Sequence, residues 1–212
     1  MTVPVQAAID RCIAARVIPV IRTGSTKAAE TVVAWLKEAG ITIFEITMTV
    51  PDAPALIADL AKDPDLLVGV GTVPDRRAAE ACIAAGTQFL VTPWVDPEIA
   101  AAANQANITL MMGAMTPTEV RAARAAGADV VKVFPAASAG GPAHIKALRS
   151  VFPGVPFCPT GGVDPMNMQS YLDAGAAFVG IGGALVEEKR ILAGDKAAIQ
   201  DVAYRLLGRA NV

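Results

Sequence analysis

Residues 116–134 read TPTEVRAARAAGADVVKVF, and this stretch contains one complete unit of the fold. Thr116 and Pro117 are typical of the first turn of a helix, and Gly127 is typical of the left-handed residue that follows the last turn. The apolar run Val130–Phe134 comes next, broken only by Lys132. Continuous rather than alternating apolarity is typical of a strand buried on both faces of a parallel sheet. The stretch therefore predicts a helix followed by a buried parallel strand.

The same alternation recurs along the chain, from a first expected helix over Val5–Ala15 onward. Eight short apolar runs are predicted to be strands: Val17–Ile21, Thr42–Thr47, Leu67–Gly71, Phe89–Thr92, Thr109–Met112, Val130–Phe134, Pro156–Pro159 and Ala177–Ile181. About eight strand–helix units predict an α/β fold of the (β/α)₈ TIM barrel type, formed by residues 1–212 as a single domain with an extra N-terminal helix. The alternative is an open, doubly wound sheet, which would need fewer strands.

Composition excludes several classes of protein. Of the 212 residues, 53% are hydrophobic and 18% are charged, which excludes a natively unfolded chain. A formal net charge of -2 gives no basic surface for nucleic acid, and no apolar run reaches the roughly 20 residues that a membrane span needs. Three scattered cysteines and a single histidine, His144, argue against a metal site and a histidine-based triad. We expect a cytoplasmic protein without a metal, another cofactor, a nucleic-acid partner or a membrane partner.

Three charged residues lie within or directly after the apolar strands. Glu45 and Lys132 stand alone inside the second and sixth predicted strands, and Arg22 directly follows the first. Burying an isolated charge is costly, so each needs a partner or a function. If Glu45 and Lys132 both point into the barrel, they can face each other, because alternate strands fill the same layer. A lysine that loses its proton part of the time can attack a carbonyl carbon and form a Schiff base, with the carboxylate moving protons. A purely structural ion pair is the alternative.

Two glycine-rich turns follow the last two predicted strands. Gly161 and Gly162 come after the seventh strand, and Gly182 and Gly183 come after the eighth. The loops after these strands are a recurrent phosphate site of barrel enzymes, and glycine lets backbone N–H groups approach the phosphate closely. Tight turns need glycine in any case, so the sequence also allows an ordinary turn at each place.

Four motifs, in this order, resemble the 2-keto-3-deoxy-6-phosphogluconate (KDPG) aldolase family, which also includes 4-hydroxy-2-oxoglutarate (KHG) aldolases. They are Phe44-Glu45-Ile46-Thr47, Gly71-Thr72-Val73, Val131-Lys132-Val133-Phe134-Pro135-Ala136 and Phe157-Cys158-Pro159-Thr160-Gly161-Gly162-Val163. The resemblance implies a class I aldolase on a (β/α)₈ barrel that acts on a phosphorylated 2-keto acid in the Entner–Doudoroff pathway. It also implies a homotrimer that needs no metal.

The same resemblance implies roles for individual residues. Lys132 is expected to be the Schiff-base lysine and Glu45 the general acid and base. Thr72 and Thr160 are expected to contact the pyruvate half of the substrate, and Pro93 to form part of the pocket wall.

Two positions depart from the family pattern. Thr49 stands where many members carry an arginine, so Arg22 is the expected partner of the substrate carboxylate; Ala184 replaces a serine after Gly182-Gly183. The alternatives are a 2-keto-3-deoxy-6-phosphogalactonate aldolase, a sugar-phosphate isomerase or epimerase on the same fold, and a non-catalytic barrel that binds a phosphorylated metabolite.

Overall fold

Eight parallel strands form one sheet in the computed structural model, which describes residues 3–208. The neighbour order is β7-β6-β5-β4-β3-β2-β1-β8, and the two end strands approach each other through a bridge between Thr160 and Gly180. The strands are β1 Val17–Ile21, β2 Ile43–Thr47, β3 Leu67–Gly71, β4 Phe89–Val91, β5 Thr109–Ala114, β6 Val130–Val133, β7 Phe157–Pro159 and β8 Val179–Ile181. The sheet is a nearly closed barrel, so the predicted TIM barrel is confirmed and the open, doubly wound alternative is wrong.

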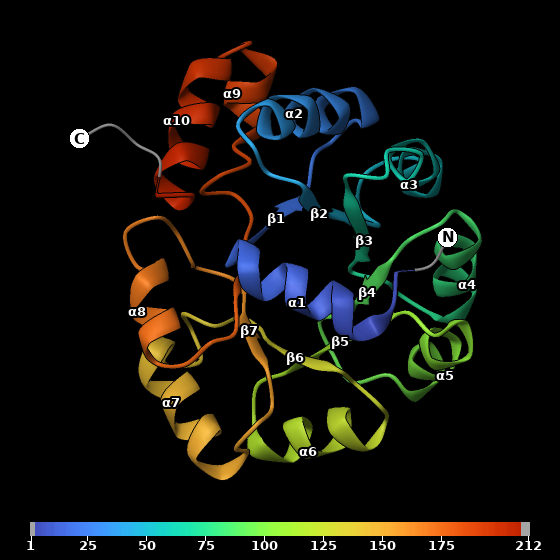
Figure 1. Cartoon of the computed structure of the whole chain (residues 1–212), viewed down its shortest axis with the longest axis vertical. Helices are drawn as coiled ribbons and strands as arrows, with labels where there is room; N and C mark the ends of the chain where they lie inside the picture. Colours follow the sequence, from blue (N-terminus) through green and yellow to red (C-terminus); the bar gives the residue numbers. More distant parts are fainter. Residues whose placement is uncertain (1–2, 209–212) are drawn as a thin grey trace.

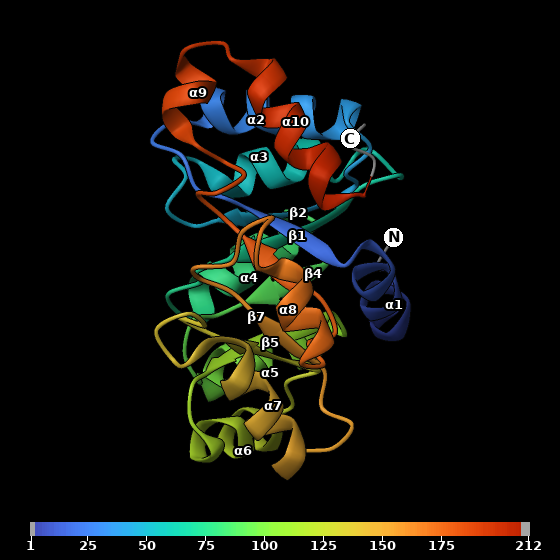
Figure 2. The same ribbon diagram turned by 90° about the vertical axis from the view of Figure 1, so that its left-hand side faces the viewer.

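Helices alternate with the strands and surround the barrel (Figures 1 and 2). They are α2 Thr26–Glu38, α3 Ala53–Leu60, α4 Arg76–Ala84, α5 Pro97–Ala106, α6 Pro117–Ala125, α7 Gly141–Val151, α8 Met168–Asp173, α9 Glu188–Leu192 and α10 Lys196–Leu206. Most of the longer helices begin at a side chain that caps the first turn; Thr116 and Glu119 form a reciprocal capping box at α6, for example. Within residues 3–208 no helix is long and apolar enough to cross a membrane.

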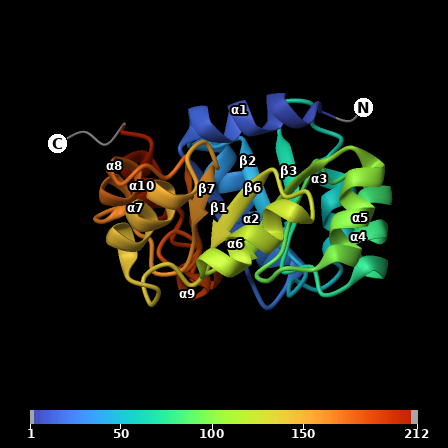
Figure 3. The same cartoon turned by 90° about the horizontal axis from the view of Figure 1, so that it is seen from below.

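The remaining helix, α1 (Val5–Ala15), lies across the end of the barrel where the strands begin (Figures 1 and 3). Its buried residues Ala8, Ile9 and Cys12 pack on inward side chains at this end of the barrel, which we call the lower barrel; they include Ile18 and Phe89. α1 therefore closes this end of the barrel, and the opposite end, where the strands finish, stays open to ligands.

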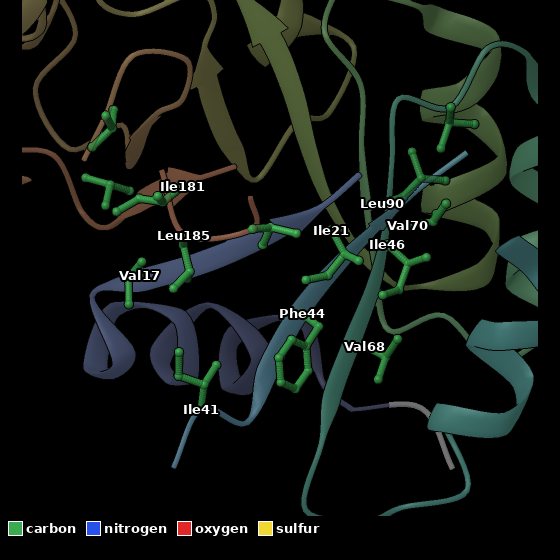
Figure 4. Packing of buried hydrophobic residues seen from close by; sticks show 14 of the residues in the cluster. Val17, Ile21, Ile41, Phe44, Ile46, Val68, Val70, Leu90, Ile181 and Leu185 are labelled. Atoms are coloured by element: carbon green, nitrogen blue, oxygen red, sulfur yellow. The ribbon is translucent and has the colours of Figure 1, made fainter. Parts of the chain in front are cut away.

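Alternate residues of each strand belong to two different parts of the core. Phe44, Ile46, Val68 and Val70 point outward into the large apolar layer under the helices (Figure 4). Residues of the other phase point into the barrel, and Glu45, between Phe44 and Ile46, is one of them. A side-chain period of two along a strand therefore places Glu45 inside the barrel.

Six strands differ from their predicted bounds: β2, β4, β6 and β7 are each one residue shorter, and β5 and β8 each differ by two residues at one end. The two larger differences come from strand pairing. β8 begins at Val179 rather than Ala177 because its partner β1 begins only at Val17, which pairs with Val179. β5 continues to Ala114 because Gly113 and Ala114 still pair with β6. Which strands pair, and in which register, cannot be read from the sequence alone, and so the sequence could not predict these two strand ends.

Candidate active site

Lys132 and Glu45 meet inside the barrel. Lys132 lies on β6 and Glu45 on β2, 87 positions apart in the chain, and Lys132 Nζ donates a hydrogen bond to Glu45 Oε1 at 3.4 Å. Lys132 is 5% exposed and Glu45 is 4% exposed. The two charges compensate each other in a site that is largely removed from water, which is the condition under which a buried ion pair persists.

Space for this pair comes from a glycine, and an aromatic ring covers the lysine. A Cβ atom on Gly71 of β3 would lie 1.9 Å from Glu45 Oε1, so only glycine leaves room for the carboxylate in its present position. Phe134 directly follows β6, and its ring centroid is 5.6 Å from Lys132 Nζ, within the range of a cation–π contact. The ammonium group thus lies near both a carboxylate and an aromatic face.

Arg22 and Thr72 form the rim above the pair. Arg22 Nη2 donates to Thr72 Oγ1 at 3.0 Å, and Arg22 Nη1 donates to Thr49 Oγ1 at 3.4 Å. Thr72 has a φ of 57°, which is a strained, left-handed conformation for a β-branched residue. Thr49 and Thr72 therefore orient the guanidinium group of Arg22, which directly follows the neighbouring strand β1.

A cleft of about 620 Å³ opens at the ends of the strands, with Lys132 in its wall. Thr160 is buried and lines the cleft next to β8, where a Cβ atom on Gly180 would lie 2.4 Å from Thr160 Oγ1. Nine of the ten residues expected from the sequence line this cleft: Arg22, Thr72, Pro93, Lys132, Thr160, Gly161, Gly162, Gly182 and Gly183. The tenth, Glu45, is not in the wall and contacts Lys132.

One side of the cleft is made of the two glycine-rich turns. Gly161 and Gly162 have φ values of 91° and 78°, which favour glycine. Within residues 3–208, the amides of Gly162, Val163, Gly183 and Ala184 have no hydrogen-bond acceptor, and all four residues line the cleft. Several free N–H groups on two adjacent loops are suited to binding an anion.

Several further lining residues were not predicted as site residues. They include Val20, Phe134 and Asp164. Phe134 stands in a motif that the sequence singled out, directly before Pro135, but the contact of its ring with Lys132 depends on the fold. Within residues 3–208, no three histidine, cysteine, aspartate or glutamate side chains converge as a group able to hold a metal ion.

Comparison of the chain with known proteins identifies the family to which it belongs. The family model of KDPG and KHG aldolases matches residues 8–202. The chain belongs to the KDPG and KHG aldolase family. A 2-dehydro-3-deoxy-phosphogluconate aldolase of Pseudomonas aeruginosa is 34% identical over 200 residues, which are 93% of this chain and 90% of that protein. The predicted family membership is confirmed.

A crystal structure from the same family has a closely similar fold. It is the KDPG aldolase of Legionella pneumophila with pyruvate captured as a covalent carbinolamine intermediate, at a TM-score of 0.87 and 32% identity, covering 96% of this chain and 98% of that one. A probable 2-dehydro-3-deoxy-6-phosphogalactonate aldolase of Rhizobium meliloti is 36% identical over 171 residues, covering 79% of this chain and 80% of that protein. Relatives named for two epimeric substrates therefore match the chain.

Proposed function

We propose that this protein is a class I aldolase that cleaves 2-keto-3-deoxy-6-phosphogluconate to pyruvate and glyceraldehyde 3-phosphate. The observation that carries the proposal is the buried Lys132, 3.4 Å from Glu45, in the wall of a cleft with free backbone amides at one side. A buried amine with a carboxylate in contact is the arrangement that imine chemistry requires.

The reaction begins when Lys132 Nζ, after giving up a proton, adds to the C2 carbonyl of the substrate. The carbinolamine loses water and becomes a protonated imine. Removal of the C4 hydroxyl proton then breaks the C3–C4 bond, whose electron pair moves into the imine to form an enamine as glyceraldehyde 3-phosphate leaves. Protonation at C3 and hydrolysis release pyruvate and restore the lysine. Glu45 supplies and accepts the protons of these steps, directly or through a water molecule.

The remaining site residues hold the substrate. Arg22, oriented by Thr49 and Thr72, binds the carboxylate with its planar guanidinium group. Thr72 and Thr160 contact the pyruvate half and Pro93 forms part of the wall. The amides around Gly161, Gly162, Gly182 and Gly183 bind the phosphate through the backbone, since Ala184 has no hydroxyl group to contribute.

The pyruvate half of this site also suits 4-hydroxy-2-oxoglutarate, which would give pyruvate and glyoxylate. A family relative from Escherichia coli, 33% identical to this chain, is named KHG/KDPG aldolase, which favours this second substrate. The phosphogalactonate epimer differs at C4, so assays with both epimers decide between the two phosphorylated substrates. We further propose that the protein is cytoplasmic and, as the resemblance implies, a homotrimer; its mass in solution, measured by sedimentation, tests the trimer.

Trapping with borohydride tests the lysine, the keto acid and the mechanism together. Incubation with pyruvate and sodium borohydride should leave a reduced, covalent pyruvate adduct on the peptide that contains Lys132. Lys132→Ala should show no adduct at this peptide and no turnover.

An adduct on a different lysine, or none on the folded protein, would contradict the proposal. Loss of activity in EDTA would instead favour a metal-dependent isomerase or epimerase.

A further inference from the structure

Asn167 lies behind the glycine turn that follows β7, outside the residues that line the cleft. Its side-chain Nδ2 donates to the Gly162 carbonyl at 2.9 Å, and its Oδ1 accepts from the Asp164 amide at 3.0 Å. Asp164 completes the contact in the other direction, because its Oδ1 accepts from the amides of Met166 at 2.8 Å and Asn167 at 2.9 Å. Asn167 and Asp164 thus clamp each other and the turn.

Three successive carbonyls of the turn are fixed from outside. The Thr160 carbonyl accepts from the Ala136 amide at 2.8 Å, and the Gly161 carbonyl accepts from the Ala137 amide at 3.0 Å. The Gly162 carbonyl is the third, and its donor is the side chain of Asn167. The first two are thus held by the backbone of the loop after β6, and the third is held by a side chain that can be replaced.

A fixed carbonyl also fixes an amide. The C=O of one residue and the N–H of the next belong to one planar peptide and point in opposite directions. The bond from Asn167 to the Gly162 carbonyl therefore directs the Val163 N–H away from Asn167, and this N–H is one of the free amides of the cleft-lining turn. Gly162 has a φ of 78°, and glycine itself restrains this peptide only weakly.

We propose that Asn167 is a positioning residue that holds the Gly162–Val163 peptide with its N–H toward the cleft and thereby sets the affinity for the phosphate group of the substrate. The inference rests on the proposed function, which places the phosphate at these amides. Asn167 itself does not touch the substrate. Its removal should therefore affect phosphorylated ligands alone, whereas a general loss of stability would affect all ligands.

The test compares wild type, Asn167→Ala and Asn104→Ala with two substrates, KDPG and 4-hydroxy-2-oxoglutarate. Asn104 is the matched control because its Nδ2 also donates to a backbone carbonyl, that of Ala126, on the outside of the barrel. Loss of one directing hydrogen bond should raise the KM of Asn167→Ala for KDPG about five- to tenfold, with kcat within about twofold of wild type. The KM for the unphosphorylated substrate should not change, and Asn104→Ala should match wild type for both.

A second variant and a binding measurement keep the test decisive. Asn167→Asp keeps an acceptor for the Asp164 amide but replaces the Nδ2 donor with an oxygen, so it should also lose phosphate affinity. Calorimetry with glycerol 3-phosphate measures that affinity without turnover, and both Asn167 variants should bind it about five- to tenfold more weakly than wild type.

Equal changes in KM for both substrates, or unchanged affinity for glycerol 3-phosphate in both variants, would overturn the role of Asn167. Absence of aldolase turnover in wild type would instead contradict the proposed function, and the glycerol 3-phosphate measurement would still decide the role of Asn167.

Discussion

Glu45 lies on a strand whose other side chains are apolar or hydroxyl-bearing, and Lys132 Nζ contacts it inside the barrel. An unpaired charge in this position would cost several kcal/mol, and the contact between the two side chains compensates that cost. The same contact gives a path for a proton between the amine and the carboxylate. Structural and chemical roles therefore depend on the same two atoms, and a substitution must separate them.

Glu45→Gln separates these roles because it keeps the shape of the side chain and removes its ability to take a proton. We expect kcat to fall by about 10²–10⁴-fold, the usual contribution of a general acid or base, while the circular dichroism spectrum stays that of wild type. Glu119→Gln is the matched control, since Glu119 accepts hydrogen bonds from Met115 and Thr116 at the start of α6 and does not line the cleft. A Glu45→Gln enzyme with kcat within a few-fold of wild type would show that the pair is structural.

Strand β3 contributes two glycines that point into the barrel at different depths. A Cβ atom on Gly69 would lie 2.1 Å from the ring of Phe89, and one on Gly71 would lie 1.9 Å from the carboxylate of Glu45. The first clash is with the apolar lower barrel and the second is with the proposed catalytic pair. The two glycines of β3 therefore lie in different layers of the barrel: Gly69 lies in the apolar layer, and Gly71 lies beside the proposed catalytic pair.

Substituting each of these glycines with alanine should have a different consequence: one should lower stability and the other should lower kcat. Gly69→Ala overpacks the core, and we expect it to lower the free energy of unfolding by about 1–3 kcal/mol with near-normal kcat in the folded fraction. Gly71→Ala displaces Glu45 from Lys132, and we expect kcat to fall at least about tenfold even where the protein is fully folded. Denaturant titration and steady-state kinetics on both variants check this; a Gly71→Ala enzyme with wild-type kcat would contradict it.

The three cysteines are all buried, and two of them, Cys12 and Cys158, belong to the same apolar cluster. Cys12 lies on α1, Cys158 lies inside the barrel, and Cys82 lies on α4 under the helical layer, with its thiol near Met48. Burial raises the pKa of the Cys12 and Cys158 thiols to about 12 and that of Cys82 to about 11. The thiols are therefore protonated and unreactive in the folded protein at pH 8.

Thiol labelling at pH 8 should consequently report the opening of the whole barrel. We expect all three cysteines to react with a thiol reagent at one common, slow rate, and to react at once in denaturant. Because folding raises these pKa values, their contribution to stability is full below the ordinary thiol pKa and is lost as pH rises toward 11–12. Faster labelling of Cys12 alone would show that α1 opens independently of the barrel.

Much of the fold could be predicted because its signals are local. Apolar runs of strand length, capping residues and terminal glycines lie within a few positions of the elements they define, and β1, β3 and α1 have the predicted bounds. The ends of β5 and β8 could not be predicted, since each depends on where a partner strand begins or ends. The candidate site could also be predicted from local signals, because charges and paired glycines are conspicuous in a chain with so few charged residues.

By itself, then, the sequence determined the alternation of strands and helices, and it singled out Lys132, Glu45 and the two glycine turns as exceptions to an apolar pattern. Only the tertiary structure decided which atoms meet: the Lys132–Glu45 contact, the support of Arg22 by Thr49, and the hold of Asn167 on the Gly162 carbonyl. The physical reason is that most of these contacts join residues far apart in the chain, and that each contact depends on the direction in which the two side chains point. Residue type and spacing set local conformation, whereas a contact between side chains depends on the register and closure of the whole barrel.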